Sequence, residues 1–391
     1  MIENRKVVVL TTHKVGGGAF VAASNFSKEL GQAKFDTPII SLDRKRLLDN
    51  AVFWVNIFLD RVFKYCLGYS NPIFHSSNTI TRYRAYDIDK FNADVANIHW
   101  FSNGLISFSS IIAMKTPYIL TFHDSWLICG MEHHPDNGVI NEGKLDRYLI
   151  DRKSKVLSKA RGYVFPSEWQ AREVNSRVGY SKPYLVVPNF CEIEKDLLGI
   201  NRSSSNTNEF TIGFVASRLF ENTSKGGADA IRLLEKLEVI VNDLKLPVRI
   251  LIAGKTSEKV PILADSGYLT IEELGEVDRA EMVSFYSRLD CFVNLSHFEN
   301  LSTTNIEAHA SGTPVICYDV GGNSETLKNG STGYLVEDRS VDGVLNAINR
   351  LILAPSKLAG MRKSARLFFV EKFGRESNLE RFIKFLEVLD V

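Results

Sequence analysis

Two glutamates, Glu299 and Glu307, stand eight positions apart in the segment FENLSTTNIEAHASGTPV, residues 298–315. Carboxylates act as general acids and bases, bind cations, or accept hydrogen bonds from hydroxyl groups. An ideal helix rises about 1.5 Å per residue, so positions eight apart lie roughly 12 Å apart along it. At that separation two carboxylates cannot share one proton or one ion, which argues against an acid–base dyad and a metal pair.

The residues between the two glutamates are typical of the start of a helix. Ser302, Thr303 and Thr304 each suit an N-cap, and Thr304-x-x-Glu307 matches a capping box. A strand–loop–helix entry also presents free backbone N–H groups that bind an anion. Glu307 is therefore open to two interpretations, a helix cap or a contact to an extended ligand. Glu299 is either an ordinary loop carboxylate or a contact to the other end of that ligand.

The surrounding elements alternate between short apolar runs and longer amphipathic runs, which is the pattern of a doubly wound parallel sheet. The first half predicts strands at 7–12, 37–42, 95–100, 117–122, 162–167 and 184–189. The second half predicts strands at 210–217, 248–254, 291–296, 314–320 and 332–337. The predicted helices lie near 18–31, 227–244, 278–289, 303–311 and 340–353, followed by a helical run from about 356 to 390.

The polar stretch NRSSSNTNE, residues 201–209, indicates a linker between two α/β domains, because it has no apolar side chain with which to form a core. A chain of 391 residues is long enough for two such domains. We expect a first domain at 1–195 and a linker at 196–208. A second domain is expected at 209–373, followed by a separate C-terminal helix at 374–391.

The charge and cysteine content exclude several classes of protein. Lys and Arg total 47 against 46 Asp and Glu, so a binder that relies on broad neutralisation of nucleic-acid phosphates is not expected. Five scattered cysteines, never spaced C-x-x-C, argue against a disulfide framework or a zinc site and fit a reducing cytoplasm. The sequence shows no secretory signal and no run of about 18 apolar residues that would span a membrane.

Two loops of the first half and one of the second carry further candidate residues. His123 follows a predicted strand, where open α/β sheets bind ligands, although a lone histidine there is more often structural. The glycine turn that includes Gly17 and Gly18 follows the first strand but lacks the G-x-G-x-x-G spacing of dinucleotide folds. Arg218 and Lys225, taken alone, are two ordinary cations in a surface loop.

Five motifs in order resemble the family 4 retaining glycosyltransferases of the GT-B fold. The segment at 298–315, followed by GGNSE at 321–325, resembles the family's E-x7-E segment. The other four are TTHKVGGGAF after the first strand, TFHD, VVPNF at the end of the first domain, and SRLFENTSKGG opening the second. The resemblance implies two Rossmann-like doubly wound domains facing a cleft. It also implies that the first binds the acceptor, the second binds a nucleotide sugar, and the C-terminal helix returns to the first.

The resemblance also implies a role for each candidate residue. Glu299 would contact the donor sugar and Glu307 the ribose hydroxyls, and Arg218 and Lys225 would neutralise the departing phosphates. His123 would lie near the donor sugar and diphosphate. Backbone amides of Asn300, Leu301 and Ser302 would hold the diphosphate. The turn with Gly17 and Gly18 suits backbone N–H groups beside a diphosphate or an acceptor. No metal and no cofactor are expected.

The implied reaction is retaining transfer of a sugar from a UDP- or GDP-linked donor to a glycan or lipid-linked acceptor in bacterial polysaccharide assembly, including lipopolysaccharide or exopolysaccharide. Two alternatives remain, a sugar-nucleotide 2-epimerase and an inactive binding partner of another transferase.

Two other segments are ambiguous. Residues 132–136, with Glu132, His133, His134 and Asp136, suit acceptor recognition better than metal. Residues 51–69 predict either a core helix or an amphipathic helix resting on a membrane surface.

Overall fold

The computed structural model describes residues 5–13, 18–66, 76–133, 143–179, 182–200, 209–258, 260 and 267–391. The chain divides into two compact units. The first is Met1–Phe190 with Glu376–Val391, and the second is Cys191–Arg375. Each unit has its own six-stranded sheet, so the predicted α/β class with two Rossmann-like doubly wound domains is confirmed.

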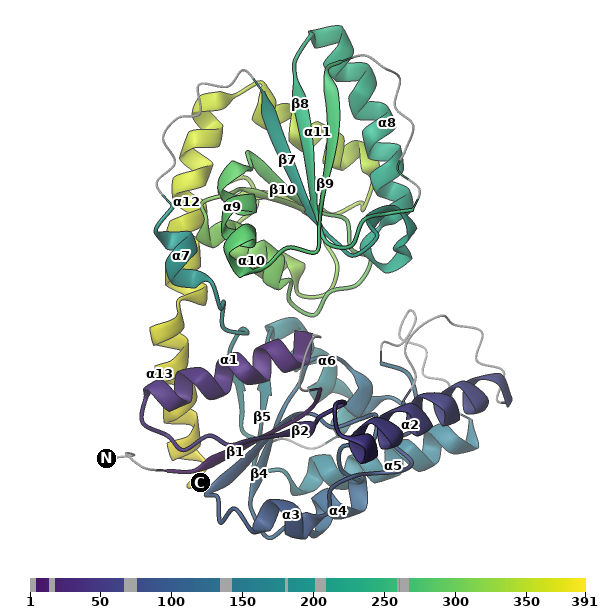
Figure 1. Cartoon of the computed structure of the whole chain (residues 1–391). Coiled ribbons are helices and arrows are strands. Elements are labelled where there is room, and N and C mark those ends of the chain that lie inside the picture. Colours follow the sequence, from purple (N-terminus) through teal and green to yellow (C-terminus); the bar gives the residue numbers. More distant parts are fainter. Residues whose placement is uncertain are drawn as a thin grey trace. The chain divides into compact units, whose positions relative to one another are not determined.

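The sheet of the first unit has the strand order β2-β1-β3-β4-β5-β6, and every pairing in it is parallel. Its strands are β1 Val7–His13, β2 Ile39–Leu42, β3 Val95–Trp100, β4 Tyr118–Thr121, β5 Gly162–Phe165 and β6 Tyr184–Val186. Its helices are α1 Gly18–Gln32, α2 Leu47–Cys66, α3 Ala85–Asp89, α4 Phe108–Ala113, α5 Lys144–Lys159, α6 Glu168–Val178 and α13 Arg375–Val388. Figure 1 labels most of these elements along the chain.

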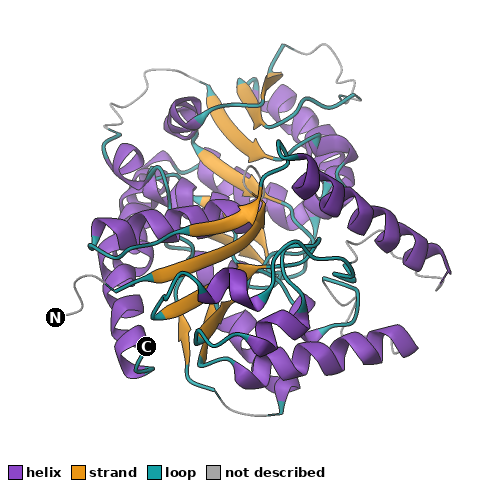
Figure 2. Ribbon diagram, turned by 60° about the horizontal axis from the view of Figure 1, so that its bottom comes forward, coloured by secondary structure: helices purple, strands orange, loops and turns teal. Residues whose placement is uncertain are grey.

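The sheet of the second unit has the order β12-β11-β10-β7-β8-β9 and is also parallel throughout. Its strands are β7 Phe210–Val215, β8 Val248–Ala253, β9 Leu269–Gly275, β10 Cys291–Asn294, β11 Val315–Tyr318 and β12 Gly333–Val336. Its helices are α7 Glu194–Leu198, α8 Gly227–Leu244, α9 Arg279–Arg288, α10 Thr303–Ala310, α11 Val341–Ile352 and α12 Pro355–Phe373. Figure 2 shows the strands among the helices that cover them, which explains why most strands are apolar on both faces.

All eleven predicted strands are present, whereas β9 was not predicted. Its sequence, LTIEELG, carries Glu272 and Glu273 in a strand at the edge of the sheet. Glu272 accepts from Arg249 on the neighbouring strand at 3.2 Å, so ion pairs replace the apolar contacts by which the other strands are recognised.

The chain passes from the first unit to the second between Phe190 and Cys191, before the polar stretch at 201–209. Cys191, Ile193 and Leu197 are buried in the core of the second unit. Cys191 and Ile193 precede α7, and Leu197 belongs to it. Residues 196–198 of this helix fall in the expected linker, while residues 201–208 lie outside the described part of the chain. The boundary differs from the expected one because apolar side chains before the polar stretch already join the second core.

The C-terminal helix α13 belongs to the first unit. The α-helix before it ends at Phe373, and Gly374 separates the two. Phe382 is fully buried, and its ring packs edge-on against Phe26 of α1 with 4.6 Å between the ring centroids. Arg381 also donates to the carbonyl of Val186 at 2.9 Å. The two ends of the chain therefore build one core.

Candidate active site

The order of strands in the second sheet indicates a ligand site at the carboxyl ends of two central strands, β7 and β10. From β7 the chain proceeds outward to β8 and β9 and then returns to β10, on the other side of β7. In open parallel sheets the loops that leave the carboxyl ends of two such strands diverge, and ligands bind between them. Here those loops are residues 216–226 after β7 and 295–302 after β10.

An ion pair joins these two loops. Nζ of Lys225 lies 2.5 Å from Oε1 of Glu299. The backbone N–H of His297 donates to the carbonyl of Ser224 at 3.0 Å. Gly226 has a φ of +75°, and a Cβ there would lie 2.2 Å from the carbonyl oxygen of Leu295, so this contact requires glycine. The structure thus brings together two residues predicted as site residues, 74 positions apart.

A glycine turn after β11 holds the backbone of Glu299 in place. The N–H of Gly322 donates to the carbonyl of Glu299 at 3.1 Å. Gly321 has a φ of +54°, and a Cβ on it would lie 1.7 Å from the same carbonyl oxygen. A side chain at Gly321 would therefore displace Glu299, which gives the GGNSE motif a structural function.

Ser302 is the N-cap of α10, and its side chain accepts from the N–H of Asn305. The capping-box interpretation of Thr304 and Glu307 is therefore wrong, because the helix begins two residues earlier than that box requires. Asn300, Leu301 and Ser302 immediately precede the first turn of the helix, where backbone N–H groups suit a phosphate.

A buried amide network supports this helix start. Nδ2 of Asn294 donates to Oγ of Ser302 at 2.9 Å and to Oδ1 of Asn305 at 3.0 Å. Nδ2 of Asn305 donates to Oγ1 of Thr326 at 3.0 Å. The sequence analysis missed these residues, although a polar side chain that ends the apolar strand CFVN was a usable signal.

Glu307 points toward Tyr286 of α9 rather than toward the helix start. The Tyr286 hydroxyl donates to Oε2 of Glu307 at 2.8 Å. Burial raises the pKa of Glu307 to about 7, and the Tyr286 hydrogen bond opposes that rise. At neutral pH the protonated and ionised forms of this carboxyl group therefore coexist. The ionised form is a strong acceptor for hydroxyl groups.

Arg218 has a different carboxylate partner from Lys225. Its Nη1 lies 2.9 Å from Oε1 of Glu258, and both side chains are exposed. Between the two cations, Asn222 organises the loop by accepting from the N–H of Lys225 at 3.2 Å and donating to the carbonyl of Ser217 at 3.2 Å. Asn222 was also missed from the sequence.

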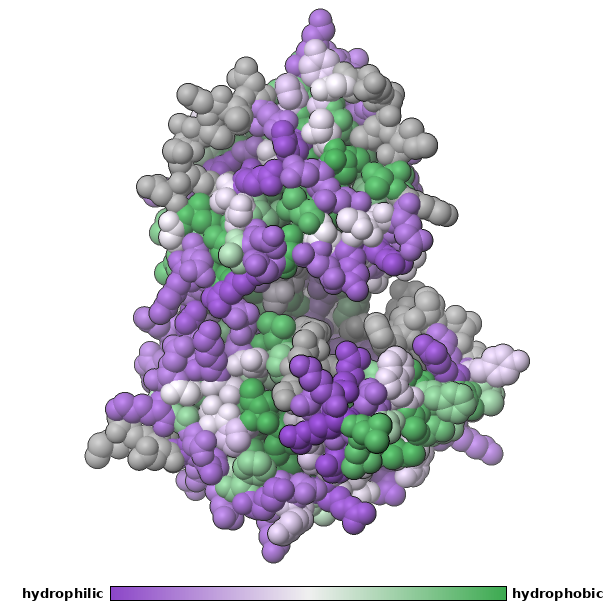
Figure 3. Space-filling model, in the orientation of Figure 1, coloured by the Kyte–Doolittle hydropathy of each residue, from purple (hydrophilic) through white to green (hydrophobic). Residues whose placement is uncertain are grey.

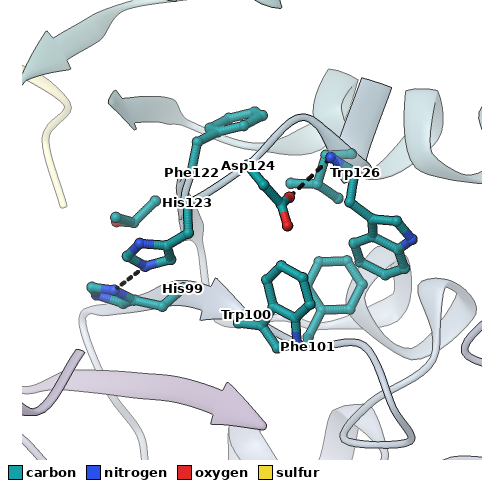
Figure 4. A pocket seen from close by; sticks show the side chains of 9 residues that line it. His99, Trp100, Phe101, Phe122, His123, Asp124 and Trp126 are labelled. Atoms are coloured by element: carbon teal, nitrogen blue, oxygen red, sulfur yellow. Dashed lines mark hydrogen bonds between the residues drawn. The ribbon is translucent and has the colours of Figure 1, made fainter. Parts of the chain in front are cut away.

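In the first unit, His123 lies in a pocket at the carboxyl ends of β3 and β4 (Figure 4). Nδ1 of His99 and Nε2 of His123 are 3.0 Å apart, and the two rings are stacked. Burial lowers the pKa of His123 to about 4 and that of His99 well below its usual value. Both rings are neutral at pH 7, so one nitrogen donates and the other accepts. The sequence analysis missed His99.

The remaining pocket residues are largely aromatic. The pocket is lined by His99, Trp100, Phe101, Thr121, Phe122, His123, Asp124, Trp126 and Leu127. Asp124 fixes the loop after His123, since Oδ1 accepts from the N–H of Trp126 at 2.9 Å and Oδ2 lies 2.8 Å from Nδ1 of His133. The ring of His133 stacks on Trp126 and Trp100.

The predicted acceptor-binding segment 132–136 is only partly described. Glu132 and His133 are buried, while His134 and Asp136 lie outside the described residues, as does Gly17. Gly18 is the first residue of α1. Within the described ranges, no group of three or more His, Cys, Asp or Glu side chains is placed to hold a metal ion.

Two family models together match most of the chain. The model described as Glycosyltransferase Family 4 matches residues 16–195, and the model described as Glycosyl transferases group 1 matches residues 200–368. The chain belongs to the family 4 glycosyltransferases. The resemblance drawn from the five motifs is thereby confirmed.

The curated relatives of this family 4 glycosyltransferase match over limited segments. The D-inositol 3-phosphate glycosyltransferase of Gordonia bronchialis is 31% identical over 150 residues, 35% of this chain and 32% of that protein. The capsular polysaccharide biosynthesis glycosyltransferase CapM of Staphylococcus aureus is 30% identical over 124 residues, 31% of this chain and 32% of that protein. The matched segments thus span about a third of these relatives' lengths.

Solved structures share the fold over nearly the whole chain. Staphylococcus aureus TarM has a TM-score of 0.68 at 16% identity, covering 97% of this chain and 99% of that one. The sucrose-phosphate synthase of Thermosynechococcus elongatus has a TM-score of 0.65 at 15% identity, with 99% of both chains covered. These likenesses identify the fold of this family 4 glycosyltransferase as GT-B.

Proposed function

We propose that this chain is a retaining glycosyltransferase that moves a sugar from a UDP- or GDP-linked donor to a glycan or lipid-linked acceptor. The main support for this proposal is the Lys225–Glu299 pair, which lies on the loops that follow β7 and β10 in the second sheet. It puts a cation for a departing diphosphate beside a carboxylate that accepts hydrogen bonds from sugar hydroxyls. UDP in the solved structures of TarM and HepE, which share the fold, supports a nucleotide donor.

The second unit would bind the donor. We assign Glu299 to the sugar, the backbone amides of Asn300, Leu301 and Ser302 to the diphosphate, and Glu307 to the ribose hydroxyls. Lys225 and Arg218 would balance the negative charge that develops on the leaving group, and for Arg218 this requires release from Glu258. In the first unit, which would bind the acceptor, His123 is assigned to the donor sugar and Gly17 and Gly18 to a backbone contact.

The proposed chemistry uses no enzyme nucleophile and no metal. The bond between the anomeric carbon and the diphosphate oxygen breaks, and the acceptor oxygen bonds to that carbon from the same face. The acceptor proton passes to an oxygen of the departing phosphate. The residues contribute by orientation and by charge stabilisation, which are large terms when the groups are held in place beforehand.

The biological setting is the last part of this proposal. We infer a cytoplasmic enzyme of bacterial surface-polysaccharide synthesis, working at the inner face of the membrane when its acceptor is lipid-linked. Similarity to CapM, named for capsular polysaccharide biosynthesis, supports this setting.

The first experiment is thermal unfolding in the presence of UDP, GDP, ADP and their sugars. A ligand that binds only the folded chain at a hundred times its Kd stabilises it by about 2.7 kcal/mol. One nucleotide should raise the Tm of the wild type and fail to do so in Lys225→Met. Absence of any nucleotide shift would contradict the proposal.

The second experiment separates transfer from the two other functions. The donor identified by Tm shift is incubated with a panel of glycan and lipid-linked acceptors, with and without excess EDTA. A product that keeps the anomeric configuration, formed equally in EDTA, is expected. Conversion of the donor alone into a new sugar would instead indicate an epimerase, and binding without turnover would indicate an inactive partner.

A further inference from the structure

The outward face of α2 carries large apolar side chains near both ends of the helix and in its middle, with the exposed Arg61 among them. Its large exposed side chains recur at helical spacing and form what we call the α2 apolar face: Leu47, Leu48, Trp54, Val55, Phe58, Val62 and Tyr65. Twenty large apolar side chains are exposed among the described residues, and seven of them lie on this helix. The green atoms at the lower right of Figure 3 lie where Figure 1 shows α2.

Three polar side chains of α2 point inward. Asp49, Asn56 and Asp60 are buried on the side that packs against the first unit. Asp49 pairs with Nε of Arg82 at 2.8 Å, and Asp60 accepts from the Ser77 hydroxyl at 2.6 Å. Asn56 donates to the carbonyl of Ile80 at 2.7 Å. These bonds fix the rotation of the helix, so its apolar face stays outward.

Of the two interpretations of residues 51–69, a core helix explains only the inward face. Val52 and Phe53 are buried in the first unit. Trp54 is 53% exposed and Phe58 is 64% exposed. A helix on the surface of a soluble protein ordinarily has the opposite arrangement, with its apolar stripe inside. The outward apolar stripe therefore indicates a binding surface for another molecule or for a membrane.

The exposed charges of residues 44–66 are all positive. Arg44, Lys45, Arg46 and Arg61 are exposed, whereas both carboxylates of this range, Asp49 and Asp60, are buried. An apolar and aromatic stripe bordered by cations complements the acyl chains and headgroups of an anionic bilayer. A protein interface of similar size would carry interspersed hydrogen-bonding groups, and this stripe has few.

We propose that the α2 apolar face and the basic residues at 44–46 dock on an anionic lipid bilayer, with the helix lying in the plane of the interface. No helix in the described ranges is long and apolar enough to cross a membrane. A 20-residue helix is about 30 Å long, so the whole stripe can contact one lipid surface. The site on the second unit plays no part in this proposal.

Sedimentation of the 391-residue chain with lipid vesicles tests the proposed docking on a bilayer. Vesicles of phosphatidylcholine with about 30% phosphatidylglycerol should bind the protein, and pure phosphatidylcholine should bind it at least tenfold more weakly, because each Lys or Arg near an anionic surface adds about 1 kcal/mol. The double variant Phe58→Ser/Val62→Ser should lose at least tenfold in binding. The triple variant with Gln at 44–46 should lose binding and its salt dependence.

The matched control replaces two exposed apolar residues of α8, as Val239→Ser/Leu244→Ser, and should leave vesicle binding unchanged. Retention of the first unit's thermal transition in each variant shows that the unit that carries α2 is folded. Equal loss in the control and in Phe58→Ser/Val62→Ser would overturn the proposal, as would no binding of the wild type to either vesicle. A wild-type dimer that Phe58→Ser/Val62→Ser converts to a monomer, without vesicle binding by either, would assign the face to a second copy of the chain instead.

Discussion

At the Lys225–Glu299 pair, each side chain neutralises the other before any ligand binds. Glu299→Ala should free the cation, so affinity for free UDP, or for whichever nucleotide binds, should stay the same or rise. Turnover should fall about 100-fold or more, because the sugar loses its contact. Lys225→Met should weaken both nucleotide binding and turnover. Calorimetric titration and initial rates measure the two effects, and equal loss of nucleotide affinity in both variants would contradict the separate roles.

Glu307 predicts a pH dependence of donor affinity. Its pKa is raised to about 7, so the carboxyl is mostly protonated at pH 5.5 and mostly ionised at pH 8.5. Only the ionised form accepts fully from ribose hydroxyls, so donor affinity should rise about tenfold as pH increases through 7. The intact nucleotide sugar is the ligand to use, since its phosphates do not titrate in this range. The Glu307→Gln variant should show a flat profile, and an equal rise in that variant would remove the role.

Lys153 is a buried lysine that the sequence did not single out, and burial lowers its pKa to about 7. It donates to the carbonyls of Trp126, Cys129 and Gly130 at 2.7, 3.0 and 2.5 Å. Lys153→Met would leave three buried carbonyls without this donor and should lower the free energy of unfolding by about 3 kcal/mol, measured by urea titration. The control is Lys155→Met on the same helix. Lys155 is exposed, so a change under about 0.5 kcal/mol is expected there.

In the candidate site, the sequence singled out the charged residues but not the residues that hold them in place. Glu299 and Glu307 lie in one segment with a recognisable spacing. The contact from Tyr286 to Glu307 joins positions 21 apart on different helices. Gly322 contacts the backbone of Glu299 only because β11 pairs beside β10. Such contacts depend on the order of strands in the sheet, which local periodicity does not determine.

Among the elements, α13 is tied to the first unit by one aromatic contact above all. Phe382 is fully buried, and its ring packs against Phe26 of α1. Phe382→Ala should cost the first unit about 3–5 kcal/mol, the usual range for removing a buried aromatic side chain. Val388→Ala, at a position 77% exposed on the same helix, is the control and should change stability little. Equal effects in chemical denaturation would argue against this packing.

Helices and strands with a simple apolar pattern were the easiest elements to predict. The helices predicted near 18–31 and 340–353 appear in the structure as α1 and α11. The pattern was misleading at β9, where glutamates replace apolar side chains, and at α2, where apolar residues lie on both faces. Apolar composition identifies a helix, but hydrogen-bond partners distant in sequence, such as Ser77 and Arg82, decide which face is buried.

For the whole molecule, the two separate cores predict two responses to one ligand. Each unit has its own sheet and its own buried clusters, and chains with two such units often unfold in more than one step. A nucleotide that binds beside Lys225 should raise the unfolding temperature of the second unit and leave the first unit's transition nearly unchanged.

Scanning calorimetry of the wild type and of Phe382→Ala, with and without nucleotide, separates the two transitions. Phe382→Ala should lower only the first unit's transition, because its side chain packs in that core alone. The nucleotide should raise the same transition in both proteins, because the proposed donor site uses residues of the second unit. If the nucleotide raised both transitions equally, the units would unfold as one, and the ligand's effect would belong to the whole chain.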